Sequence, residues 1–116
     1  MATSPATLFW KSTCTTCRDV RSALLARPGQ RPLVDMNYSK APLTHDEVRA
    51  IVAAAGVTTL LNATHAIAKE RGWRASPPDA DTFIASAVAE PNLLRRPILL
   101  LGGKAWVHRE CLGAPT

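Results

Sequence analysis

The sequence has no apolar run long enough to cross a membrane. Its longest strongly apolar stretch is Pro97–Leu101, whereas a membrane-spanning helix needs about 20 apolar residues. The segment Met1–Trp10 carries no charged side chain and no long apolar core, so it does not resemble a secretory signal. We therefore expect a cytoplasmic protein without a membrane partner.

Aromatic residues and clusters of like charge are also scarce. Aromatic side chains make up 5% of the chain, and no block contains five like charges although the net charge is +5. Residues 1–40 carry six basic and two acidic side chains, residues 41–90 four and six, and residues 91–116 four and one. Proteins that bind nucleic acid combine clustered basic residues with aromatic platforms. We expect no direct contact with nucleic acid.

Cysteine is rare, and the number of cysteines is odd. Three cysteines in 116 residues are too few for the disulfide framework of a small secreted protein. The chain is 47% hydrophobic, and this length suffices to bury a core without a metal or disulfide. We predict one domain spanning residues 1–116.

The first third of the chain has the pattern of a strand, a helix and a second strand. Ala6–Lys11 is β-prone, Val20 and Leu24 recur at helical spacing before a Pro-Gly pair, and Pro32–Asn37 is a second apolar segment. Two short strands around one helix favour a parallel βαβ unit.

The middle of the chain is predicted to be a helical insert over about residues 43–91. Thr44 and Glu47 have the spacing of a capping box, and an apolar stripe with helical period follows as far as Gly56. Two short helical pieces and a helix opened by Pro77-Pro78-Asp79 complete the insert.

The last part of the chain is predicted to form a β-hairpin. Pro97–Leu101 and Lys104–His108 are separated by a Gly-Gly pair, which is a hairpin signal. The final residues, Leu112–Thr116, are expected to be frayed.

Two cysteines in a Cys-Thr-Thr-Cys motif stand between the first strand and the first helix. A helix N-terminus lowers the pKa of a thiol placed there, so Cys14 is the predicted nucleophile. Cys17 lies one turn further on and is the predicted resolving thiol. Lys11 and Arg18 add positive charge nearby.

Two other interpretations of this pair stay open at this point. Both thiols could be small buried hydrophobic groups, or half of a zinc site completed by Cys111 and His108. That ligand spacing is uncommon, and we predict no metal. Cys111 is predicted to be a free thiol, and His108, which alternates with Trp106, to pack or lie at the surface.

These features together resemble the arsenate reductase (ArsC)/Spx family of thioredoxin-fold proteins. The resemblance extends from about residue 7 to residue 109, and its most specific parts are the cysteine loop and the Arg96-Pro97-Ile98 segment. It implies an α/β, thioredoxin-like fold with a four-stranded mixed sheet and a helical insert. It also implies that Pro97 is a cis-proline facing the cysteine loop.

The resemblance further implies a thiol–arsenate adduct at the first cysteine, with arginines holding the oxyanion. By position Arg96 is the best match, and Arg109 is a second. With Lys11, Arg18 and Pro97 they are the predicted contacts to a small anionic or thiol substrate. Glutathione, thioredoxin or glutaredoxin is the implied electron donor, and no tightly bound cofactor is expected.

The chain departs from the family pattern at two places. Many relatives have an arginine after Leu-Leu-Asn, where this chain has Thr64, and the glutathione-linked arsenate reductases often have serine where it has Cys17. Cys17 points toward the Spx-like and uncharacterised reductase branches. The alternative to a thiol-dependent oxidoreductase is therefore an Spx-like regulator that binds RNA polymerase through a Cys14–Cys17 disulfide switch.

Overall fold

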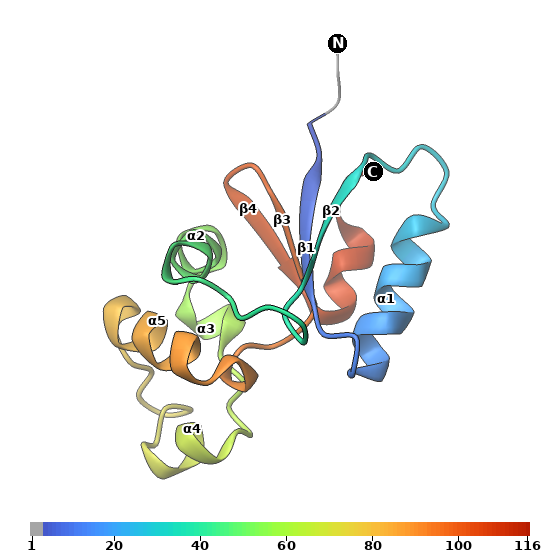
Figure 1. Ribbon diagram of the computed structural model, residues 1–116. Helices are drawn as coiled ribbons and strands as arrows, with labels where there is room; N and C mark the ends of the chain where they lie inside the picture. Colours follow the sequence, from blue (N-terminus) through green and yellow to red (C-terminus); the bar gives the residue numbers. More distant parts are fainter. Residues whose placement is uncertain (1–3) are drawn as a thin grey trace. The chain divides into compact units, whose positions relative to one another are not determined.

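The computed structural model describes residues 4–116, which divide into two compact units. The sheet unit contains the described residues up to Ala41 together with Arg96–Thr116, and the helical unit contains Pro42–Arg95. Figure 1 shows all four strands and helix α1 in the sheet unit, and helices α2 to α5 in the helical unit.

The sheet unit is built on a mixed four-stranded sheet with strand order β2-β1-β3-β4. β1 pairs with β2 in parallel, whereas β1 with β3 and β3 with β4 are antiparallel. This topology confirms the predicted α/β fold. The strands are β1 (Ala6–Trp10), β2 (Leu33–Asn37), β3 (Ile98–Leu101) and β4 (Lys104–Val107).

The hairpin between β3 and β4 is also confirmed. Its turn contains Gly102, with φ of 60°, in the left-handed region that glycine adopts without a steric penalty. The peptide bond between Arg96 and Pro97, just before β3, is cis, as the resemblance implies.

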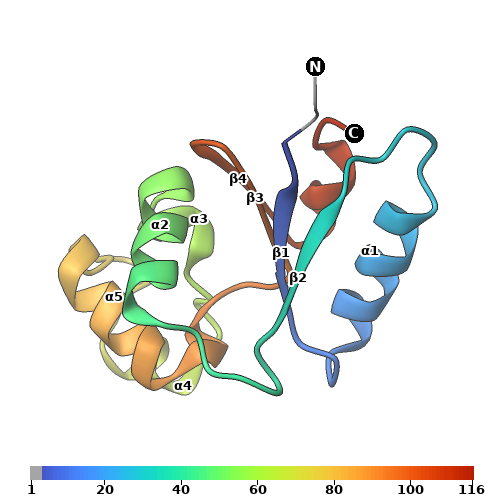
Figure 2. The ribbon, with the colours of Figure 1, turned by 45° about the horizontal axis from the view of Figure 1, so that its top comes forward.

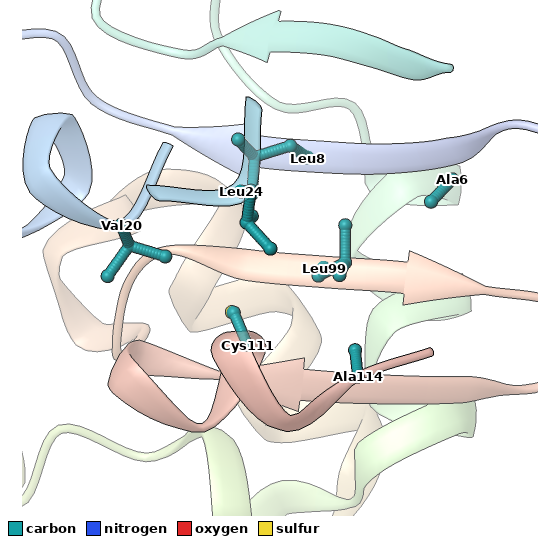
Figure 3. Packing of buried hydrophobic residues seen from close by; sticks show 7 residues of the cluster. All are labelled: Ala6, Leu8, Val20, Leu24, Leu99, Cys111 and Ala114. Atoms are coloured by element: carbon teal, nitrogen blue, oxygen red, sulfur yellow. The ribbon is translucent and has the colours of Figure 1, made fainter. Parts of the chain in front are cut away.

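One face of the sheet is covered by α1 (Thr15–Leu25) and the 3-10 helix η2 (His108–Gly113), which lie side by side in Figures 1 and 2. Apolar side chains from β1, α1, β3 and η2 point toward one another in this core (Figure 3). Leu8, Val20, Leu24, Leu99 and Cys111 are each at most 1% exposed. The side chains of β1 alternate between the two faces of the sheet, which explains why Leu8 reaches this core.

The C-terminal segment is ordered against the core, so the prediction that it frays is wrong. Ala114 is buried, and Arg27 Nη1 donates to the carbonyl of Leu112 at 3.2 Å and to that of Ala114 at 2.8 Å. The backbone N–H of Arg31 donates to the carbonyl of Thr116. These donors come from residues about 85 positions away, so local sequence could not reveal them.

The helical unit contains α2 (His45–Ala55), α3 (Val57–Leu60), α4 (Ala66–Glu70), α5 (Ala80–Ala89) and the 3-10 helix η1 (Pro91–Leu93). The capping box at α2 is complete, because Thr44 N donates to Glu47 Oε1 at 2.8 Å and Glu47 N donates to Thr44 Oγ1 at 3.1 Å. Within the unit α2 contacts α5, and both helices bury their apolar stripes. In the described part of the chain, no helix is long and apolar enough to cross a membrane.

We predict that Thr44→Ala lowers the free energy of unfolding by about 1 kcal/mol, because the substitution leaves a backbone N–H of α2 without its acceptor. Urea denaturation measures this loss. Thr58→Ala is the control, since Thr58 is exposed on α3 and should change stability by less than about 0.5 kcal/mol. Equal losses in the two variants would contradict this role of the capping box.

Candidate active site

Four strand ends meet at one edge of the sheet. The parallel strands β1 and β2 both end there, and the antiparallel β3 begins there. β4 runs antiparallel to β3, with Ile98 opposite Val107, so it also ends at this edge. The edge therefore receives the cysteine loop after β1, Tyr38 after β2, Arg96 and Pro97 before β3, and His108 after β4.

The loop that leads to Cys14 is fixed by Asn37, the last residue of β2. Asn37 Oδ1 accepts from the backbone N–H of Ser12 at 3.1 Å, and Asn37 Nδ2 donates to Ser12 Oγ at 3.0 Å. Asn37 Oδ1 also accepts from Ser39 N at 3.1 Å. One side chain thus ties the cysteine loop to the loop after β2.

Arg18 and Lys11 support the same loop. Arg18 Nη1 donates to the Ser12 carbonyl at 2.7 Å, and Arg18 Nη2 donates to Thr15 Oγ1 at 3.2 Å. The backbone carbonyl of Lys11 accepts from Cys14 N at 3.0 Å and closes a tight turn. The structure therefore shows both residues bracing the cysteine loop, while their predicted contacts to substrate stay predictions.

Cys14 is the N-cap residue of α1 and is partly exposed. Burial raises the pKa of its thiol, but the backbone N–H and side chain of Cys17 and the guanidinium of Arg96 lower it, and the net pKa lies below the ordinary value. Cys14 makes no capping hydrogen bond of ordinary geometry, so we ascribe the backbone contribution to the N–H dipoles at the helix start. A thiolate is therefore favoured at an accessible position.

The other two cysteines have the opposite environment. Cys17 is fully buried, and burial together with the neighbouring Cys14 raises its pKa to about 11, although the backbone N–H of Lys11 and the charge of Arg96 oppose the shift. Burial also raises the pKa of Cys111 to about 12. All three cysteines are free, and only Cys14 is both accessible and easily ionised.

Tyr38 is a residue of this site that the sequence did not indicate. Its side chain is 7% exposed, and its hydroxyl has no hydrogen-bond partner among the described residues. Burial raises its pKa, and the charges of Cys17, Arg96 and Cys14 act on the hydroxyl. In the β1–β2 pair Trp10 lies opposite Asn37, so the next residue, Tyr38, lies at this edge. Only the pairing register of β1 and β2 would have placed Asn37 and Tyr38 near the cysteine loop.

The structure shows the surroundings of Arg109, a predicted contact, and of Thr64, which stands where many relatives have an arginine. Arg109 is exposed on η2, and within residues 4–116 its side chain has no hydrogen bond or ion pair. Thr64 donates its hydroxyl to Asn62 Oδ1 at 2.7 Å inside the helical unit, and this short neutral side chain cannot supply a guanidinium. Pro97, by contrast, is buried and directly follows Arg96 at the cysteine edge.

The zinc interpretation has no ligand set in the described part of the chain. No three His, Cys, Asp or Glu side chains among residues 4–116 are grouped so that they could hold a metal ion.

The sheet topology and a cysteine at the start of the first helix define a thioredoxin-like α/β protein with an ionisable thiol at one sheet edge. A family model confirms and narrows this class. The ArsC family model matches residues 9–110, and the chain belongs to the ArsC family.

Solved structures share this fold at low sequence identity. An arsenate reductase from Vibrio cholerae is 18% identical with a TM-score of 0.74, and the match covers 92% of each chain. An arsenate reductase (ArsC) related protein from Brucella melitensis is 20% identical with a TM-score of 0.68, covering 92% of this chain and 88% of that one. A search of curated protein sequences returned no significant match.

We predict that Arg96→Met raises the pH midpoint of Cys14 alkylation, because the thiolate loses a charged hydrogen-bond donor. Iodoacetamide labelling across pH, followed by peptide mass spectrometry, measures the midpoint. Arg95→Met is the control, since the Arg95 guanidinium donates to the Thr59 carbonyl within the helical unit. Equal midpoints in wild type and Arg96→Met would contradict the role of Arg96.

We also predict that wild-type stability falls as pH rises from about 9 through 11. The folded chain holds the Cys17 proton up to a pKa of about 11, while the unfolded chain loses it near the ordinary 9.0, so rising pH favours unfolding by up to about 3 kcal/mol. Urea denaturation of wild type and Cys17→Ala between pH 8 and 11 isolates this contribution. The same pH slope in both proteins would show that Cys17 titrates normally.

Proposed function

We propose that the protein is a thiol-dependent oxidoreductase of the arsenate reductase-like type, with Cys14 as nucleophile. The observation that carries the proposal is the accessible Cys14 thiol at the start of α1, whose pKa Cys17 and Arg96 hold below the ordinary value. The thiolate is the reactive form of cysteine, so this position supplies a nucleophile near neutral pH. Arg96 beside it gives an anionic substrate a planar, forked donor.

The proposed reaction on a disulfide substrate has two steps. The Cys14 thiolate attacks one sulfur of the substrate, which forms a mixed disulfide and releases the other sulfur as a thiolate. Cys17 then attacks the Cys14 sulfur, forms the Cys14–Cys17 disulfide and releases the second substrate thiol, to which its proton passes through solvent. Two electrons leave the protein, and glutathione or a thioredoxin-type protein returns them.

The environments of the two thiols support this order of steps. Burial is the largest cause of the raised pKa of Cys17, and the negative charge of Cys14 adds to it. Formation of a mixed disulfide at Cys14 removes that charge, so the pKa of Cys17 falls just when Cys17 is needed. The reaction at Cys14 therefore makes the Cys17 thiolate easier to form than it is in the reduced protein.

Arsenate is the second substrate class to be tested, since the names of the Vibrio cholerae and Brucella melitensis proteins contain it. A tetrahedral oxyanion needs several donors, and the forked guanidinium of Arg96 is the candidate at Cys14. The regulatory alternative uses the same two thiols with a different output, namely RNA polymerase binding by the disulfide form. Both proposals place the protein in a reducing compartment such as the cytoplasm, where a dithiol is regenerated.

The test is turnover of arsenate and of a small aromatic disulfide, with glutathione plus glutaredoxin or with thioredoxin as donor. We expect at least one substrate to be consumed by wild type and the rate to fall by at least about 100-fold in Cys14→Ser, because the nucleophile is lost. Cys17→Ser should accumulate a mixed disulfide at Cys14, seen as a mass increase of the intact protein. Cys111→Ser is the matched control, because Cys111 is fully buried and its thiol cannot meet a substrate.

Absence of Cys14-dependent turnover with every substrate and donor would overturn the enzymatic proposal. Retention of RNA polymerase by the oxidised form and not by the reduced form would then favour the regulator. A rate that is the same in Cys14→Ser and wild type would assign the activity to another group.

A further inference from the structure

The side chain of His108, the first residue after β4, contacts the backbone of Arg96. His108 Nδ1 is 3.2 Å from the Arg96 carbonyl oxygen, and the backbone N–H of His108 donates to the Pro97 carbonyl at 2.8 Å. A carbonyl only accepts hydrogen bonds, so the Nδ1 atom must carry the hydrogen in this contact. A single residue thus binds two successive carbonyls at the start of the segment that supplies Arg96.

His108 adopts a backbone conformation that its side chain makes costly. Its φ is 58°, and it is the one non-glycine residue with positive φ in the described range 4–116. A residue keeps such a strained backbone conformation where several surrounding contacts hold it in place, and these residues are often found at functional sites. Cys111 adds a further contact, since its Sγ lies 3.6 Å from the Pro97 carbonyl oxygen and 3.3 Å from that of Trp106.

The Arg96 guanidinium sits at the end of a long side chain with several rotatable bonds. Where it can reach depends on the position of its own backbone. That backbone lies outside β3, which begins at Ile98, so the regular pairing of the sheet does not fix it. The contact from His108 is a direct restraint on the Arg96 carbonyl.

We propose that His108 is a positioning residue that fixes the backbone of Arg96 and thereby holds its guanidinium beside Cys14. The inference deepens the proposed function and rests on it, because Arg96 is assigned there to the Cys14 thiolate and its substrate. The contact does not require a charged imidazole.

The test compares two neutral substitutions at this position. His108→Gly removes the ring and relaxes the positive φ, whereas His108→Asn tolerates that φ and places its amide nitrogen where Nδ1 was. We expect His108→Gly to raise the pH midpoint of Cys14 alkylation by about half a unit, which means a roughly threefold slower reaction at a pH well below that midpoint. His108→Asn should restore the wild-type midpoint, and the melting temperature of His108→Gly should be unchanged or higher.

Identical midpoints in the glycine and asparagine variants would overturn the proposal, as would a change of midpoint that only follows a loss of melting temperature. Nitrogen-15 NMR of the imidazole tests the restraint without any chemistry at Cys14. A neutral His108 with its hydrogen on Nδ1 supports the proposal, and a hydrogen on Nε2 alone refutes it. If wild-type Cys14 titrates at the ordinary value while the Nδ1 form is present, the proposed function fails and the restraint stands.

Discussion

The pairing of β1 with β3 is the constraint on which the site depends. Phe9 lies opposite Ile98 in this antiparallel pair, so the chain leaves β1 toward Cys14 at the edge where it enters β3 from Arg96. About 80 residues separate Cys14 from Arg96 in the sequence. The backbone hydrogen bonds between β1 and β3 bring their two segments together. A shift of one residue in that register would move every side chain of the strand to the opposite face. The buried Leu8 and Leu99 make such a shift costly.

Three identical thiols acquire different chemistry from that framework. Cys111 and Cys17 face the interior, where an anion is poorly solvated, and their protons are retained. Cys14 lies one helical turn before Cys17 and is partly exposed to solvent. There the backbone N–H groups at the start of α1 and the guanidinium of Arg96 lower its pKa. Reactivity is thus assigned by position on the helix and not by residue type. Cys111 serves the fold, with its sulfur against two backbone carbonyls.

The sequence predicted what depends on neighbouring residues. The β-prone run Ala6–Lys11, the Thr44–Glu47 spacing and the Gly-Gly turn are local patterns, and the elements they predict are present. The position of Cys14 at a helix start followed from the same kind of pattern. Asn37 and Tyr38 were missed because their proximity to the cysteine loop follows from strand register. His108 was assigned to packing because a left-handed backbone at a non-glycine residue has no sequence signature.

The paired strands β1 and β3 are far apart in the sequence, and this affects the order in which the site forms as the polypeptide is synthesised. The cysteine loop leaves the ribosome early, but Arg96 and the strand that carries it are made some 80 residues later. Until then Cys14 lacks its guanidinium neighbour, and β1 lacks the partner that becomes central to the sheet. Cys14 therefore gains one of the two neighbours that lower its pKa only after Arg96 has been made.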